Sequence, residues 1–102
     1  MAVVAQYIVK PQPGSDLAEL INMTAEIAAL WRTFGGNVKL WSPSVGEVGN
    51  LVLAVGFQTF KAYGDAVDKL YASKAFHDWQ AKRLKSGMTE WVRDSVAVEI
   101  SI

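Results

Sequence analysis

Residues 35–57, GGNVKLWSPSVGEVGNLVLAVGF, decide the fold of this chain. They contain two predicted strands, residues 37–42 and 51–57, joined by a loop that holds glycine and serine. The second strand is apolar at every position before Gly56, whereas a strand with one face in water would alternate between apolar and polar residues. We therefore expect both faces of this strand to be covered.

Predicted elements on either side complete a regular order. Apolar periodicity predicts strands at residues 3–10, 37–42, 51–57 and 90–102, and helical regions at residues 16–34 and 59–87. Ser73 resembles a second helix cap, so the second helical region is expected to break near Ala72. The order β-α-β-β-α-β, with the second helix split, predicts an α+β ferredoxin-like domain over residues 1–102. Its four-stranded antiparallel sheet would carry both helices on one face.

Charge and composition exclude several classes of protein. Ten basic residues balance ten acidic ones, so we expect no nucleic acid partner, because phosphate binding needs a basic face. The chain has no cysteine, and its single histidine lies near no ligand-spaced carboxylate pair, so we expect no metal site. No apolar run approaches the roughly 20 residues of a membrane span, and the N-terminal segment is a poor signal peptide. These features favour a cytoplasmic protein that does not contact a membrane.

The face of the sheet that is turned away from the helices needs a cover. Strands 3–10, 51–57 and 90–102 carry apolar residues at both parities, and each large apolar side chain left in water forgoes roughly 1.5–3 kcal/mol. An apolar patch of this extent is unusual on a monomer. We therefore expect a homodimer in which two copies pack their open sheet faces together.

Two segments resemble a known group of proteins. The segment LYASKAFHDW at residues 70–79 and the segment FQTFKAY at residues 57–63, together with the order of elements, resemble the dimeric α/β-barrel superfamily. Within it, the chain is most similar to NIPSNAP-like proteins and to antibiotic-biosynthesis monooxygenase-like proteins. The resemblance implies a dimer whose sheets pair into a barrel, with a cavity in each subunit between sheet and helices.

The resemblance leaves the reaction open. Some members of the superfamily oxidise aromatic polyketides without a cofactor, some degrade haem, and many have no assigned activity. Haem-degrading members combine a helical histidine, an asparagine on the first strand and a tryptophan, whereas the first strand here has Gln6 in the corresponding region. We therefore expect no cofactor.

His77 is the candidate catalytic residue. It is the only histidine, and histidine is the side chain whose ordinary pKa lies near neutrality, so it suits a proton carrier. It lies off the apolar stripe of Phe76 and Trp79, however, and this position favours a solvated or capping histidine over a catalytic one. The candidate ligand pocket is aromatic and comprises Tyr7, Trp41, Phe57, Tyr63, Phe76 and Trp79.

Two of the tryptophans have alternative assignments. Trp41 lies on the strand face opposite Val38 and Leu40, so it fits either the dimer interface or the rim of a pocket. Trp91, at the start of the last strand, has the same two options. Trp31 fits the apolar stripe of the first helix and is assigned to the core.

Two functions follow. The first is a small-molecule enzyme or binding protein that holds an apolar, planar aromatic ligand between sheet and helices, similar to a cofactor-free monooxygenase. The second is a non-catalytic dimerisation or stress-related module that has no small-molecule substrate. The sequence contains no nucleophile–base pair, phosphate-binding loop or dinucleotide fingerprint that would decide between them.

Overall fold

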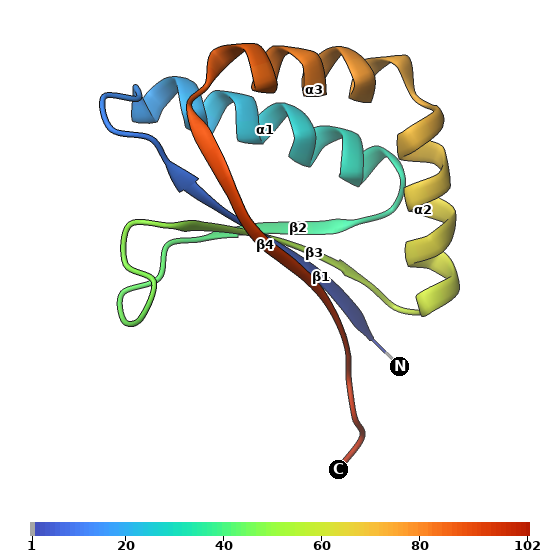
Figure 1. Ribbon diagram of the computed structural model, residues 1–102. Coiled ribbons are helices and arrows are strands. Elements are labelled where there is room, and N and C mark those ends of the chain that lie inside the picture. The colour runs from blue at the N-terminus through green and yellow to red at the C-terminus, as the bar shows by residue number, and fades with distance from the viewer. Residues whose placement is uncertain (1) are drawn as a thin grey trace.

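The computed structural model describes residues 2–102 and has one four-stranded antiparallel sheet in the order β2-β3-β1-β4. The three helices lie on one side of this sheet, and the opposite side carries no helix (Figure 1). The predicted α+β ferredoxin-like fold is confirmed. Its elements are β1 (Val3–Pro11), α1 (Leu17–Thr33), β2 (Asn37–Trp41), β3 (Leu51–Phe57), α2 (Phe60–Ala72), α3 (Lys74–Ser86) and β4 (Thr89–Val98).

Helix α1 begins and ends where the sequence provides its caps. The Asp16 carboxylate accepts hydrogen bonds from the backbone N–H groups of Ala18 and Glu19, at 2.9 and 3.3 Å. At the other end, Gly35 takes a left-handed φ of +92°, which allows the chain to leave the helix. Gly36 is required for another reason, since a Cβ atom there would lie 2.7 Å from the Val55 side chain.

The second helical region consists of two separate helices that meet at one residue. Ser73 has an extended conformation and ends α2, with its N–H bonded to the Leu70 carbonyl oxygen. Its hydroxyl then accepts a hydrogen bond from the Phe76 N–H and begins α3. The chain turns here, so that α2 stands at one end of the sheet while α3 runs beside α1 (Figure 1).

The core lies between the sheet and the helices. Residues opposite one another in an antiparallel pair point to the same side, so the register gives one helix face, which includes Ala5, Tyr7, Val55 and Val38. Helices α1 and α2 pack on this face. The buried cluster comprises Ile27, Ala28, Trp31, Val38, Val55, Phe57, Ala66 and Leu70.

A β-bulge changes the face of one side chain in β4. The pairing between β1 and β4 shifts between Ile8 and Val9, so that Ile8 opposes Arg93 while Val9 opposes Trp91. Because of this bulge, Trp91 points to the helix face, although strict alternation along β4 would place it on the same face as Arg93.

The open face of the sheet is partly covered by the loop between β2 and β3. Arg93 on β4 forms an ion pair with Glu47 of this loop. Ile8 on β1 is paired with Arg93 on one side and with Val52 of β3 on the other. Ile8 is only 6% exposed although no helix covers it. The rest of the open face includes Val4, Gln6 and Ala54.

Strand β4 is shorter than the sequence predicted. It ends at Val98, and among residues 2–102 only the hydrogen bond from the Glu99 N–H to the Ala2 carbonyl oxygen continues its pairing. Residues 99–102 leave the sheet (Figure 1), and Ile100 is 81% exposed. Within residues 2–102, none of the helices has both the length and the apolar character that crossing a membrane requires.

Candidate functional site

A cavity of about 250 Å³ lies between the helix face of the sheet and helices α1 and α3. All four strands contribute to its floor, with Leu40, Leu53, Val9 and Asp94 among the lining residues. Six aromatic side chains surround it: Tyr7, Trp31, Tyr71, Phe76, Trp79 and Trp91. The cavity is therefore an aromatic chamber with few polar groups, which is the usual composition of a small-molecule site.

The aromatic rings around the cavity pack against one another in two groups. Tyr7 lies with its ring centroid 6.1 Å from Trp31 in a stacked arrangement and 5.6 Å from Trp91. Phe76 stacks on Trp79 at 6.3 Å and lies 5.5 Å from Tyr71. Such ring pairs hold the walls in defined orientations. A flat ligand could therefore enter between surfaces that are already ordered.

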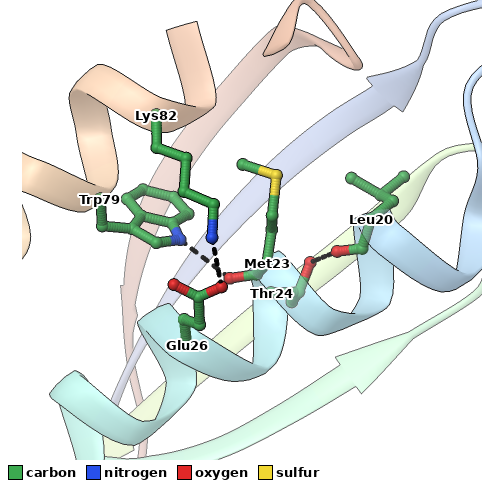
Figure 2. A network of polar contacts seen from close by, with 6 residues as sticks. All are labelled: Leu20, Met23, Thr24, Glu26, Trp79 and Lys82. Carbon is green, nitrogen blue, oxygen red and sulfur yellow. Dashed lines mark hydrogen bonds and ion pairs between the residues drawn. The ribbon is translucent and has the colours of Figure 1, made fainter. Parts of the chain in front are cut away.

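Two polar links join α3 to α1, and one of them is made by two cavity-lining residues, Trp79 and Met23 (Figure 2). The Trp79 indole N–H donates to the Met23 carbonyl oxygen at 2.8 Å, and the Lys82 ammonium contacts the Glu26 carboxylate at 2.8 Å. Helix α3 has no fully buried residue of its own. Its position over the cavity therefore depends on these links and on the half-buried faces of Phe76 and Trp79.

Tyr7 is a hydrogen-bond donor in this cavity and not a base. Burial raises the pKa of its phenol well above the ordinary value, and the neighbouring Tyr63 raises it further. The hydroxyl therefore stays protonated throughout the physiological range. It can donate a hydrogen bond to a ligand oxygen but cannot accept a proton from a substrate.

Charged groups in the cavity are few. Arg83 on α3 and Asp94 on β4 are the charged residues that line it. Asp94 lies directly opposite Tyr7 in the β1–β4 register. Burial lowers the pKa of Arg83, whose guanidinium lies 5.2 Å from the centroid of the Trp91 ring.

Three of the predicted site residues lie at the cavity and four do not. Tyr7, Phe76 and Trp79 line it. Trp41 is 56% exposed on the open face, because its register partner Val52 points away from the helices. Phe57 is buried in the core, and Tyr63 packs against Phe57 with ring centroids 5.8 Å apart.

His77 lies outside the cavity on an exposed part of α3. Its Nε2 atom is 2.7 Å from the carbonyl oxygen of Tyr71. That carbonyl belongs to the last turn of α2 and has no partner within the helix, so the imidazole caps the end of α2. This geometry fits the capping alternative for His77.

The sequence did not identify Arg83 and Asp94 as cavity residues, and it left Trp91 between the dimer interface and the rim of a pocket. Arg83 could have been identified, because it falls on the apolar stripe of Phe76 and Trp79, where a charged side chain is unusual and indicates a specific role. Periodicity could not decide between the two options for Trp91, since its orientation depends on the bulge. Asp94 points to the helix face like Val96, but nothing in its spacing indicates that a cavity is there.

Comparison with known proteins gives the fold and no more. No protein-family model matches the chain, and no curated protein matches it. Solved structures do match. A NIPSNAP-like domain protein from Burkholderia xenovorans has a TM-score of 0.75 at 14% identity, covering 98% of this chain and 86% of that one. A NIPSNAP family protein from Agrobacterium tumefaciens has a TM-score of 0.73 at 16% identity, covering 98% and 94%.

A third solved structure is that of an oxygenase. SnoaB from Streptomyces nogalater, a cofactor-independent oxygenase, has a TM-score of 0.70 at 14% identity, covering 99% of this chain and 95% of that one. At these identities the likeness concerns the backbone alone. The chain therefore has the fold that NIPSNAP-like proteins and this oxygenase share.

Proposed function

We propose that this protein binds a small, planar, mainly apolar aromatic molecule in the cavity between the sheet and helices α1 and α3. The observation that carries the proposal is the set of six aromatic side chains that surround a cavity of about 250 Å³. Rings of this kind bury large apolar area at little entropic cost, and they bind flat ligands through stacked and edge contacts. Tyr7 adds one hydrogen-bond donor that fixes the orientation of the ligand.

The tryptophans provide a direct test. Trp31, Trp79 and Trp91 line the cavity, whereas Trp41 lies on the open face. Addition of 2-naphthamide, a neutral bicyclic aromatic probe, should shift the indole N–H resonances of the first three in a ¹⁵N-correlation NMR spectrum and leave that of Trp41 unchanged. Equal shifts of all four resonances, or of none, would contradict the proposal.

The finer proposal is oxygenation without a cofactor, as in the structurally similar SnoaB. Such an enzyme must take the electrons that reduce O₂ from its substrate, and a substrate gives them most readily as an anion. A base at the cavity is therefore required. Asp94 is the carboxylate that lines the cavity, and His77 lies outside it, so Asp94 is the better candidate for this role.

Oxygen uptake separates catalysis from binding. Anthrone has an acidic CH₂ group, and its reaction with O₂ to anthraquinone and water consumes measurable oxygen. We expect uptake above the uncatalysed rate in the wild type and in His77→Ala, and a loss of most of it in Asp94→Asn. Binding of aromatic probes without oxygen uptake would show that the protein binds such molecules but does not oxygenate them. An absence of both binding and uptake would favour the non-catalytic module.

We also propose a homodimer through the open sheet face. This proposal is supported by the lack of helices on that face and by its apolar residues, among them Val4 and Val52 (Figure 1). Trp41 on the same face is exposed. Sedimentation at micromolar concentration should give about twice the 11.2 kDa mass of the chain, and a purely monomeric species would contradict it.

A further inference from the structure

Arg83 is a cation inside a largely apolar cavity. It is half-buried on α3, and its Nε–H donates to the Gln80 side-chain oxygen at 3.2 Å. Its guanidinium lies 5.2 Å from the centroid of the Trp91 ring. Neither Nη atom has a hydrogen-bond partner within residues 2–102. The fork of donors at its end is therefore available to a ligand.

The charge of Arg83 is not balanced by a carboxylate. The four ion pairs among residues 2–102 involve Lys61, Lys74, Lys82 and Arg93, and none of them involves Arg83. A cation that is partly removed from water without a counter-ion is unfavourable, and an anion that reaches it restores the balance. Burial also lowers the pKa of this guanidinium, because the charged form is disfavoured when it is removed from water.

Asp94 decides which end of the cavity an anion would occupy. This carboxylate lies beside Tyr7, and its oxygen atoms are more than 4 Å from the Arg83 nitrogens, since the two form no ion pair. A negative group at the Tyr7 end would be repelled by Asp94. A negative group at the Arg83 end would meet Gln80 and the free Nη donors instead.

The nature of the anion follows from the number and shape of its partners. Arg83 is the one cation among the residues that line the cavity, so a monoanion is matched better than a dianionic phosphate. A guanidinium presents two parallel N–H groups that fit the two oxygens of a carboxylate. The aromatic walls require the remainder of the ligand to be flat and apolar.

We propose that the ligand is an aromatic monocarboxylate, bound with its carboxylate against the Nη atoms of Arg83 and its ring toward Tyr7, Phe76 and Trp79. This inference rests on the proposed aromatic site and adds the chemical class of the ligand. Arg83 acts as the specificity-determining residue of the cavity. It selects carboxylates over neutral molecules of the same shape.

Two probes of equal shape test the inference. 2-Naphthoate and 2-naphthamide differ in charge at one position, and their dissociation constants can be measured by calorimetry on the full chain. The wild type should bind 2-naphthoate roughly tenfold more tightly, as expected of a charge-assisted, two-point hydrogen bond in a partly buried site. The preference should weaken as the salt concentration rises from about 0.05 to 0.5 M.

Substitutions assign the preference to one residue. Arg83→Gln should bind the two probes equally while keeping the affinity for 2-naphthamide, and Arg83→Lys should keep part of the preference. Lys85→Gln is the matched control, because it removes the same charge from the last turn of α3 at a residue that does not line the cavity. It should leave the tenfold preference intact.

The outcomes are distinct. Equal binding of both probes by the wild type, or a preference that survives Arg83→Gln, would overturn the carboxylate inference and leave the aromatic site standing. Failure of both probes to bind would overturn the aromatic site and the inference together. A preference that disappears equally in Lys85→Gln would show that general electrostatics, and not Arg83, causes it.

Discussion

The indole N–H of Trp79 donates a hydrogen bond to the carbonyl oxygen of Met23, at 2.8 Å, and so joins α3 to α1 across 56 residues of sequence (Figure 2). Both residues also line the cavity. One contact therefore holds the two helices together and defines one wall of the candidate site. Because α3 contributes no fully buried side chain, few other interactions can replace this bond.

Trp79→Phe should destabilise the protein and loosen α3. The ring would still pack on Phe76, but the hydrogen bond to α1 would be lost at a cost of about 1 kcal/mol. Urea unfolding measures this loss, and hydrogen exchange should show that α3 amides open more often than those of α1. Protection of α3 equal to the wild type would contradict the anchoring role.

Lys82→Gln is the matched control on the same helix. It removes the second link between α3 and α1, the ion pair with Glu26, whose side chains are 57% and 48% exposed. Exposed pairs of this kind contribute little, so the expected loss is below about 0.5 kcal/mol. A larger effect for Lys82→Gln than for Trp79→Phe would reverse the ranking of the two links.

Local signals in the sequence were sufficient for most of the fold. Each of three features could be recognised from neighbouring residues alone: the cap of α1 at Asp16, the glycines that end α1, and the unbroken apolar strand β3. The end of β4 was not predictable in this way. Residues 99–102 continue the alternation of the strand, but the β1–β4 register ends at the pair Val3–Val98, and the bond from the Glu99 N–H to the Ala2 carbonyl oxygen is its last extension within residues 2–102.

The candidate site was predictable only in part, for a physical reason. Tyr7, Phe76 and Trp79 follow regular periodicity, so their side of the strand or helix could be inferred. Trp91 reaches the cavity through a bulge, which periodicity cannot reveal. His77 was the candidate catalytic residue because its ordinary pKa lies near neutrality, whereas its position is explained by its hydrogen bond with the carbonyl oxygen of Tyr71.

Gly36→Ala should be more destabilising than Gly35→Ala. A methyl group at Gly36 would lie 2.7 Å from Val55 Cγ1 and 3.1 Å from the Trp31 carbonyl oxygen, and Val55 is fully buried and cannot move away. We expect a loss of about 2 kcal/mol from overpacking. Gly35 has open space but a φ of +92°, so alanine there should cost about 1 kcal/mol. Denaturant midpoints compare the two, and an equal or reversed order would contradict the packing argument.

Stability should fall at alkaline pH because of Tyr7. Burial, with a further contribution from Tyr63, raises the pKa of its phenol in the folded state, whereas the pKa of the unfolded phenol is about 10. Above that pH the unfolded chain loses a proton that the folded chain keeps, so unfolding becomes more favourable as pH rises. Urea midpoints between pH 8 and 11 should decline more steeply for the wild type than for Tyr7→Phe. Parallel declines would show that Tyr7 is not responsible.

Val4→Lys should separate dimerisation from ligand binding. Val4 lies on the central strand β1 and points to the open face, opposite Gly56 and Ala97. A lysine there would place a charge in the centre of the proposed interface, where burial without a partner is costly. Sedimentation should then show a monomer, while 2-naphthamide still shifts the cavity indoles. Ala25→Lys adds the same charge on the exposed surface of α1 and should leave the dimer intact; an unchanged dimer in Val4→Lys would exclude the open face as the interface.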